Sequence, residues 1–461
     1  MPTAKLDVDV CVVGAGFAGL TTARMLVAEG YTVAVLEARD RVGGRTWSDS
    51  AAGGLAIDRG GAWLSPRHTA ALALAAELGV PTYKTYVAGS HLLVSEGRMQ
   101  RYKGLIPRIS PLALIQIAAT QWRVDRMARQ VPVDEPWSAP RAAEWDADSV
   151  GDWLSRVRIR SDVGRDLFSM AVRGLFAATD MRDVSLLHLL FLVRAHEKIE
   201  DLFSIEGGAQ ENLVEGGLAG LAVRMAADLG EAVRLGAAVR SITQTGDGVA
   251  VGAEGHEVSA RCAVVAIPPA LALGIDFDPI LPADRQDLYA AAVGGVESKT
   301  LVVYETPFWR EEGLSGQTAA AGSASEVTID SSPSDGSRGV LASFTFGAVA
   351  ERMDALPQEQ RRAAVLEALA RRFGPRAATP LDFVETPWWQ EPWSRGCSFA
   401  HLPPGMLTRH GHLLRQPFGR VHWAGTETAT VSHGAVDGAI RSGQRAAREV
   451  LPVLEVLAPS R

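Results

Sequence analysis

Residues 10–20 read Val-Cys-Val-Val-Gly-Ala-Gly-Phe-Ala-Gly-Leu, and residues 33–37 read Val-Ala-Val-Leu-Glu. An apolar run ends in a Gly-x-Gly-x-x-Gly turn, a helical pattern follows, and a second apolar run ends in an acid. In such a unit, Gly14 allows the tight turn, Gly16 lets the backbone approach a pyrophosphate, and Gly19 lets the helix pack on the strand. The helix N-terminus adds free N–H groups and the positive end of its dipole. The stretch therefore predicts a dinucleotide site.

The residues that follow indicate which dinucleotide is bound. Glu37 can accept hydrogen bonds from both ribose hydroxyls, which favours an unphosphorylated ribose. Residues 38–46 then read Ala-Arg-Asp-Arg-Val-Gly-Gly-Arg-Thr. A glycine pair flanked by arginines is unusual at this point in nicotinamide-binding units and common in FAD-binding units. Arg39 and Arg45 can pair with the pyrophosphate, and Gly44 lets the isoalloxazine end pass close to the backbone. This likeness implies FAD, and a solvated basic turn is the alternative.

Length and composition limit the class of protein. The chain has 461 residues, which suits two domains better than one core, and its net charge of -7 argues against nucleic acid as a partner. Residues 1–9 are polar, and no stretch has the roughly 18 uninterrupted apolar residues that a membrane span needs. We therefore expect a cytoplasmic protein without a membrane span. Cys11, Cys262 and Cys397 form no disulfide framework, and their spacing fits no metal site.

The hydrophobic periodicity predicts an α/β chain with an α+β second domain. Helices are expected over 69–78, 112–129, 162–176, 185–194, 218–229, 358–373 and 435–450. Strands are expected over 233–235, 238–242, 249–251, 262–267, 300–304 and 340–346. Residues 81–208 look mostly helical, whereas residues 285–392 alternate as in an antiparallel sheet that forms a pocket wall.

Two blocks near the end of the chain contain the most closely spaced motif residues. Residues 388–398 read Trp-Trp-Gln-Glu-Pro-Trp-Ser-Arg-Gly-Cys-Ser, and residues 421–430 read Val-His-Trp-Ala-Gly-Thr-Glu-Thr-Ala-Thr. With the glycine motif and the Arg-Val-Gly-Gly-Arg block, they resemble the flavin-containing monoamine oxidase family, within the FAD-dependent amine oxidase superfamily, over essentially the whole chain. The resemblance implies a discontinuous, Rossmann-like FAD-binding domain, a substrate-binding domain with a mixed or antiparallel sheet, and a short tail. The implied boundaries are 1–80, 209–284 and 394–455 for the first, 81–208 and 285–393 for the second, and 456–461 for the tail.

The resemblance also implies roles for single residues. Lys299 matches the family lysine that holds a water near the flavin N5, and Trp389 matches the tryptophan packed beside the flavin. Thr426 and Glu427 lie where family members approach the ribityl and pyrophosphate region. The expected cofactor-binding set is Gly14, Gly16, Gly19, Glu37, Arg39, Gly44, Arg45, Gly61, Trp63, Val239, Trp389, Cys397, Gly425, Thr426 and Glu427.

Cys397 matches the cysteine that some family members link through sulfur to the 8α-methyl carbon of the flavin. It lies in a glycine-flanked loop, whereas Cys11 and Cys262 lie in apolar strands. The preceding residues 394–396, Ser-Arg-Gly, depart from the usual Ser-Gly-Gly, and some relatives bind FAD without a covalent bond. Both covalent and non-covalent FAD therefore remain open.

The substrate site departs from the family pattern. Leu175, Phe203 and Gln210 fall where the family lines its substrate cavity. Two facing aromatic side chains usually stand in front of the flavin, and this chain has Ser398 and Ala435 at those positions. The missing pair argues against a simple arylalkyl monoamine and leaves a wider or more polar space.

The implied activity is oxidation of an amine to an imine, which hydrolyses to an aldehyde or ketone and ammonia or a smaller amine. Oxygen takes up the electrons and becomes hydrogen peroxide, and no metal is required. The implied partners are an amine, oxygen and a second copy of the chain in a homodimer. An L-amino-acid oxidase is the first alternative, and it would need a cation such as Arg67 or Arg173 for the substrate carboxylate. An oxidase or desaturase of a non-amine substrate, and a flavin protein without catalysis, are the others.

Overall fold

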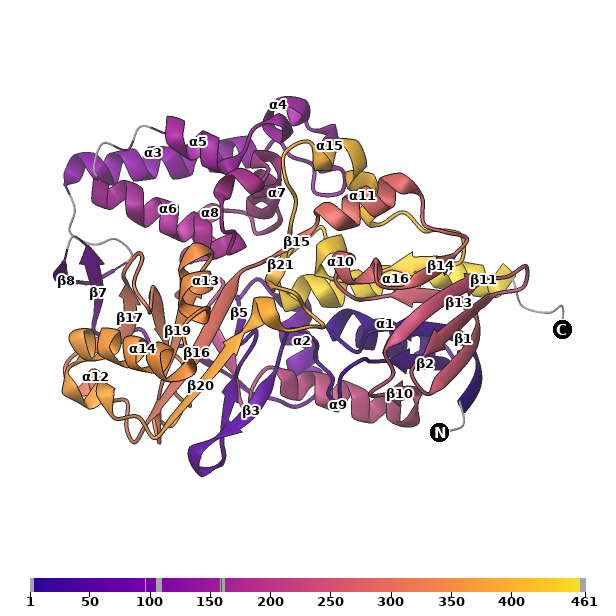
Figure 1. Ribbon diagram of the computed structural model, residues 1–461, viewed down its shortest axis with the longest axis horizontal. Helices are drawn as coiled ribbons and strands as arrows, with labels where there is room; N and C mark the ends of the chain where they lie inside the picture. Colours follow the sequence, from indigo (N-terminus) through magenta and orange to yellow (C-terminus); the bar gives the residue numbers. More distant parts are fainter. Residues whose placement is uncertain (1–3, 96, 105–109, 158, 160–161, 457–461) are drawn as a thin grey trace.

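Two sheets lie at opposite ends of the molecule, and helices cover them (Figure 1). The computed structural model describes residues 4–95, 97–104, 110–157, 159 and 162–456. The first sheet contains the glycine motif and lies near both ends of the described chain, on the right in Figure 1. The second sheet lies on the left, beneath a group of helices drawn in purple and magenta.

Parallel strands form the centre of the first sheet, in the order β10-β2-β1-β13, with β22 also paired to β13. Their bounds are Val233–Arg234, Val33–Leu36, Ala4–Val13, His256–Val265 and Val421–Trp423. Three more strands extend the sheet, namely β12 (Val249–Ala253), β11 (Val239–Gln244) and β14 (Asp276–Asp278). The parallel strands are apolar because both faces are covered. This arrangement confirms the predicted α/β, Rossmann-like fold.

Close packing of α1 (Phe17–Ala28) on this sheet depends on Gly19. A Cβ at Gly19 would lie only 2.0 Å from the Gly14 carbonyl oxygen. Helices α9 (Ala219–Leu229) and α16 (Val436–Val456) pack against α1, and α2 (Thr69–Glu77) packs against α16. The last helix was expected to end at residue 450 but continues past Pro452. Leu454 is buried in the core around the sheet, so tertiary packing outweighs the helix-breaking tendency of the proline.

The second sheet has the order β20-β16-β19-β18-β17-β7-β8 and is antiparallel except for the β17–β7 pair. The bounds are Asp382–Pro387, Glu297–Tyr304, Gly339–Phe346, Val327–Asp330, Leu314–Ala319, Ser90–Ser95 and Arg98–Tyr102. The mostly helical pattern expected for residues 81–208 is therefore wrong at its start, where β7 and β8 complete the sheet edge. The partner of β7 is β17, more than 200 residues later, so local periodicity could not reveal it.

Helices cover the remaining faces. The group above the second sheet comprises α3 (Pro111–Ala128), α4 (Ala142–Ala147), α5 (Val150–Arg156), α6 (Asp162–Phe176), α7 (Leu186–Ala195) and α8 (Ile199–Phe203). The expected helices near 162–176 and 358–373 are confirmed, the latter as α14 (Gln358–Phe373). The others are α10 (Pro269–Ala272), α11 (Ala283–Ala291), α12 (Phe308–Glu311), α13 (Ala348–Asp354) and α15 (Met406–His410). None of the helices in the described ranges combines the length and apolarity that a bilayer crossing needs.

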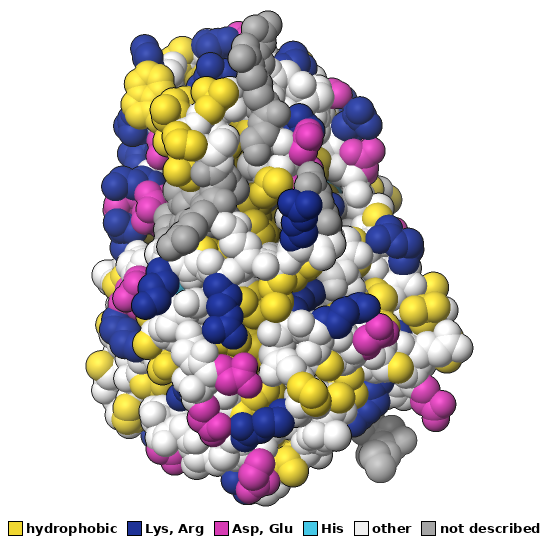
Figure 2. Space-filling model, turned by 90° about the vertical axis from the view of Figure 1, so that its left-hand side faces the viewer, with side chains coloured by type: hydrophobic (Ala, Val, Ile, Leu, Met, Phe, Trp, Pro, Cys, Tyr) yellow, Lys and Arg dark blue, Asp and Glu magenta, His cyan; other side chains and the backbone are white. Residues whose placement is uncertain are grey.

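The outer face of α3 carries exposed apolar side chains, Leu112, Ile115 and Trp122. Figure 2 shows the corresponding end of the molecule, where apolar and basic side chains are interspersed.

Smaller sheets of two or three strands complete the described fold. They are β3 (Ser48–Ala51) with β4 (Leu55–Asp58), β9 (Asn212–Val214) between β5 (Trp63–Leu64) and β6 (Thr82–Lys84), and β15 (Val293–Gly295) with β21 (Cys397–His401). The β15–β21 pair brings Cys397 beside the start of β16, because Gly295 pairs with Cys397. This pairing joins two distant stretches of sequence at the site described next.

Candidate active site

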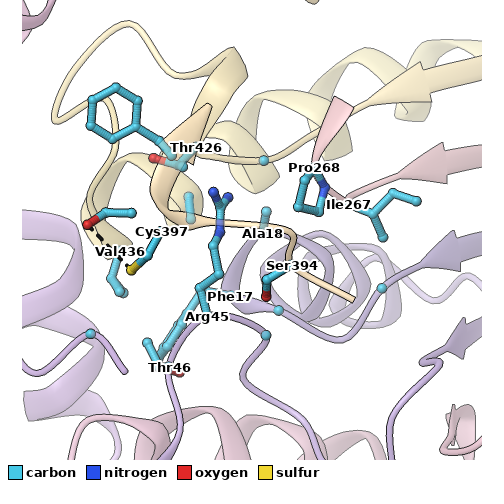
Figure 3. Close-up of a pocket in the computed structure, with 18 of the residues that line it drawn as sticks. Phe17, Ala18, Arg45, Thr46, Ile267, Pro268, Ser394, Cys397, Thr426 and Val436 are labelled. Atoms are coloured by element: carbon cyan, nitrogen blue, oxygen red, sulfur yellow. Dashed lines mark hydrogen bonds between the residues drawn. The ribbon is translucent and has the colours of Figure 1, made fainter. Parts of the chain in front are cut away.

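A cavity of about 440 Å³ runs from the glycine motif to Cys397, which begins β21 and does not lie in the expected loop (Figure 3). Most of the predicted site residues line it although they are far apart in the sequence. They are Gly14, Gly16, Glu37, Arg39, Gly44, Arg45, Gly61, Trp63, Leu175, Gln210, Val239, Cys397, Ser398, Gly425, Thr426 and Ala435. Gly19, Lys299, Phe203, Trp389 and Glu427 do not line it.

The glycine end of the cavity has the features of a pyrophosphate cradle. Gly16 caps α1 without a side-chain hydrogen bond, so backbone N–H groups of the first turn are free to bind an anion. A Cβ at Gly16 would meet nothing within 4 Å, which leaves the space that a dinucleotide backbone needs. Glu37 is buried, and its two oxygens accept the N–H groups of Ala15 at 2.8 Å and Arg39 at 3.0 Å. The backbone therefore fixes the carboxylate that is expected to bind the ribose.

The arginines near the motif have protein partners. Arg39 donates to Glu391 at 2.6 Å and to Ser394 at 2.9 Å. Arg45 donates to both oxygens of Glu427, at 2.6 Å and 3.0 Å, and its guanidinium reaches into the cavity between Cys397 and Ala18 (Figure 3). Each arginine is therefore already paired with a carboxylate of the protein and is not free to bind a pyrophosphate. Each still lines the cavity, where paired guanidinium groups hold its wall in place.

Lys299 lies behind the cavity wall, on β16. It is 2% exposed, and its Nζ donates to the Gly60 carbonyl at 2.8 Å. The same nitrogen lies 4.8 Å from the centre of the Trp63 ring, a cation–π contact. Burial lowers the pKa of Lys299 to about 8, although the carboxylates of Asp58 and Glu297 act in the opposite direction. The ammonium thus lies next to the second glycine turn, and its pKa is close to neutral pH.

The position of Trp389 does not match its predicted role. Its Nε1 donates to Asp354 at 2.7 Å, on the side of β16 away from the cavity. Its neighbour Trp388 is fully buried, donates to the Arg59 carbonyl at 2.9 Å, and packs so tightly on Gly60 that a Cβ there would lie 2.8 Å from the indole. Adjacent residues in a short 3₁₀ turn face different directions, so the sequence could not decide which tryptophan points toward the glycine turn.

Three histidines that no sequence motif marked also line the cavity, namely His68, His196 and His433. Burial lowers the pKa of His68 and of His433 to about 4, so both rings are neutral at pH 7. Ser398, Ala435 and Leu175 line the same cavity, whereas Phe203 packs against the core. The histidines come from three distant segments, and no motif marks them. The wall they form is uncharged.

The family comparison agrees with this geometry. A family model described as flavin containing amine oxidoreductase matches residues 17–451. This chain belongs to that family. It is 43% identical over 447 residues to “Putative flavin-containing monoamine oxidase AofH” of Mycobacterium tuberculosis, with 97% of each chain covered. It is 34% identical to amine oxidase [flavin-containing] A of Equus caballus, with 97% of this chain and 85% of that protein covered.

Solved structures agree with the same assignment. Wild-type putrescine oxidase bound to putrescine superposes with a TM-score of 0.93 and 34% identity. Cyclohexylamine oxidase from Brevibacterium oxydans superposes with a TM-score of 0.92 and 33% identity. Both alignments cover 97% of this chain and 100% of the other. The protein is therefore an FAD-containing oxidoreductase that oxidises amines and uses oxygen, as the motifs predict.

An amino-acid oxidase would need a free cation for the substrate carboxylate, and neither of the two arginines proposed for this role is free. Arg67 pairs with Asp201 at 2.6 Å, and Arg173 pairs with the buried Glu326 at 2.7 Å. Neither arginine lines the cavity. A substrate carboxylate would have to break one of these ion pairs to gain a partner.

Two glycine substitutions separate packing from cofactor binding. We expect Gly19→Ala to lower the free energy of unfolding by about 1–3 kcal/mol, because the new methyl group overlaps backbone that cannot move. We expect Gly16→Ala to change it by less than about 1 kcal/mol but to reduce the flavin content of the isolated protein, since the methyl enters the pyrophosphate space. Flavin-to-protein ratio and denaturant unfolding measure the two effects. Equal loss of stability in both variants would contradict this assignment.

Proposed function

We propose that the preferred substrates are aliphatic or alicyclic primary amines rather than arylalkyl monoamines. The observation that carries this proposal is the pair Ser398 and Ala435, two small side chains that both line the cavity. An aromatic pair at these positions would confine a flat ring, whereas small side chains leave width for a bulkier or more flexible group. The names of two structurally similar proteins, putrescine oxidase and cyclohexylamine oxidase, are consistent with such substrates.

The cavity wall selects the neutral form of the amine. FAD supplies the acceptor of the two electrons and the hydrogen removed from the carbon next to nitrogen. The nitrogen lone pair assists this step, so the amine has to enter without its extra proton. Apolar residues such as Leu175 and Leu192 and the uncharged ring of His433 disfavour an ammonium ion. We assign to Lys299 the role of holding a water near the flavin N5, because two of its three N–H groups remain after the bond to Gly60.

We also propose that Cys397 forms a thioether with the 8α-methyl carbon of FAD. Its side chain lines the cavity beside Arg45 (Figure 3), whereas Cys11 and Cys262 are buried inside strands of the first sheet. Burial raises the pKa of the Cys397 thiol well above its usual range, and the nearby carboxyl of Glu297 raises it further. The thiol therefore needs a proton acceptor before it can react.

The predicted domain boundaries, the homodimer and the cytoplasmic location remain proposals. Strands from residues 1–80, 209–284 and 394–455 share the first sheet, which supports grouping these segments as one FAD-binding domain. The three cysteines are free thiols, which is consistent with a reducing compartment. Light scattering on the purified protein tests the dimer, and cell fractionation tests the location.

Anaerobic mixing tests the substrate proposal. We expect cyclohexylamine and putrescine to bleach the visible absorbance of the flavin faster than benzylamine does, because the wide cavity holds the benzyl ring loosely. In the variant that combines Ser398→Tyr with Ala435→Tyr, the restored aromatic pair should raise the benzylamine rate relative to that of cyclohexylamine. Faster bleaching by benzylamine in the unmodified protein would contradict the proposed preference. Bleaching by L-amino acids alone would contradict the main function.

A further inference from the structure

Glu297 is a buried carboxyl that the mechanism above does not use. It is 8% exposed and begins β16, two residues after Gly295, which pairs with Cys397. The Glu297 and Cys397 side chains are both buried, and each shifts the pKa of the other. Three other buried carboxylates have arginine partners: Glu326 pairs with Arg173, Asp330 with Arg310 and Glu427 with Arg45. Glu297 forms none of the ion pairs found among the described residues, and the nearby cation that lowers its pKa is Lys299.

The spacing along β16 separates the two buried groups. Residues two apart on a strand point to the same face and lie about 6.6 Å apart. Lys299 contacts the Gly60 carbonyl, at the second glycine turn. Glu297 lies toward Cys397, because Gly295, two residues before it, pairs with Cys397 at the end of the cavity where the thioether would form. One strand face thus presents a cation and a carboxyl to two different parts of the cofactor site.

We propose that Glu297 is the general base for covalent attachment of FAD to Cys397, an inference that rests on the proposed thioether. The carboxylate takes the proton of the thiol as Sγ forms its bond to the 8α-carbon. The S–H bond and one C–H bond of the 8α-methyl group break, and the two electrons released reduce the flavin ring. Oxygen, the acceptor in the normal reaction, then takes the two electrons and two protons and becomes hydrogen peroxide. The net change joins one thiol, one FAD and one oxygen molecule into a thioether and one peroxide.

The electrostatics of the pair suit this role. The thiolate, not the thiol, is the nucleophile, and a thiol buried next to a carboxyl does not ionise by itself near neutral pH. Burial raises the pKa of Glu297 to about 7, opposed by Lys299, so the carboxyl can gain and lose a proton under working conditions. A base is most effective when its pKa lies near the operating pH.

Ser398 is the rival proton acceptor. The Cys397 Sγ lies 3.7 Å from the Ser398 hydroxyl oxygen, and Figure 3 marks this contact with a dashed line from the sulfur. A hydroxyl accepts a proton far less readily than a carboxylate, so it could only relay one. Comparing variants at the two positions separates these roles.

The test follows covalent attachment, not amine turnover. The full chain, produced with limiting flavin, is incubated with FAD in air, and samples are denatured with acid over time. Protein-bound flavin is then measured by its fluorescence on a denaturing gel and by intact mass. We expect Glu297→Gln to slow attachment about 100-fold, at the lower end of the contribution of a general base, while FAD still binds and is released by acid. Glu297→Asp keeps a carboxyl and should attach FAD faster than Glu297→Gln.

Each outcome decides between the two proposals. Covalent flavin in Glu297→Gln at the wild-type rate overturns the role of Glu297 and leaves the thioether intact. If attachment is slow in Ser398→Ala but not in Glu297→Gln, the proton transfer belongs to Ser398, and the proposed role of Glu297 is overturned. No covalent flavin in the unmodified protein overturns both the thioether and the base. Equal slowing in Glu297→Asp and Glu297→Gln indicates a packing effect and overturns the base.

Discussion

Glu427→Gln is expected to lower the free energy of unfolding by about 3–5 kcal/mol, because it leaves the Arg45 guanidinium in the cavity wall without its counter-charge. Glu427 is 5% exposed and accepts two hydrogen bonds from Arg45, at 2.6 Å and 3.0 Å. It also accepts the N–H of Ala400 at 3.2 Å, so the pair ties the Arg-Val-Gly-Gly-Arg loop to β21. Denaturant unfolding of the protein and the variant at pH 7 measures the loss.

An exposed ion pair in the same protein provides the matched control. Arg376 and Glu311 are 2.9 Å apart, with side chains 55% and 61% exposed. Glu311→Gln should change stability by less than about 1 kcal/mol, because water screens the pair. If Glu427→Gln and Glu311→Gln lower the free energy of unfolding by the same amount, the buried pair contributes no more to stability than the exposed pair, and the prediction is wrong.

The pH dependence of this pair has a defined sign. Burial alone would raise the pKa of Glu427, but the Arg45 guanidinium and its hydrogen bonds outweigh burial and lower it from 4.5. A carboxyl whose folded pKa is depressed contributes stability above its unfolded pKa, and the contribution is lost as the pH falls through the folded pKa. The difference in stability between the protein and Glu427→Gln should therefore shrink below about pH 4.

The cofactor and the fold could be predicted from the sequence, because places where two backbone segments approach closely require particular residues. Gly14 and Gly19 allow contacts that any side chain would block, so their spacing marks the strand–helix turn without knowledge of the rest of the chain. In the second block near the C-terminus, Gly425 has a φ of 129°, which favours glycine, and it lines the same cavity together with Thr426. Local backbone constraints of this kind can therefore be recognised from the sequence alone.

The remaining features depend on contacts between distant segments. Trp388 and Trp389 are neighbours in the sequence, and only the turn that contains them decides which indole faces Gly60. His68 and His433 line the same cavity although they are far apart in the sequence. Glu297 acquires a chemical role only because β15 pairs with β21. Periodicity and motif spacing report what a segment does locally, so these three features could not be predicted from them.

Lys299→Met is expected to slow reoxidation of the reduced flavin by oxygen about 100-fold, with a much smaller effect on anaerobic bleaching by an amine. Negative charge develops on oxygen as it takes electrons, and a fixed cation in a water-excluded site stabilises that charge more than water does. Removing one such group typically costs about 100-fold to 1,000-fold in rate. Stopped-flow mixing of the reduced protein with oxygen measures the loss, and anaerobic mixing with substrate measures the other half-reaction.

The charge of Lys299 also gives this rate a pH dependence that tests its cause. Burial lowers the pKa of Lys299 to about 8, while Asp58, Glu297 and Cys397 act against this shift. The ammonium form is therefore lost as the pH rises through about 8, and reoxidation of the unmodified protein should slow over the same range. Lys299→Met should show no such decline, and Lys299→Arg, which keeps its charge, should stay faster than Lys299→Met at high pH. A decline of equal size in Lys299→Met would assign the titration to one of the neighbouring groups instead of the lysine.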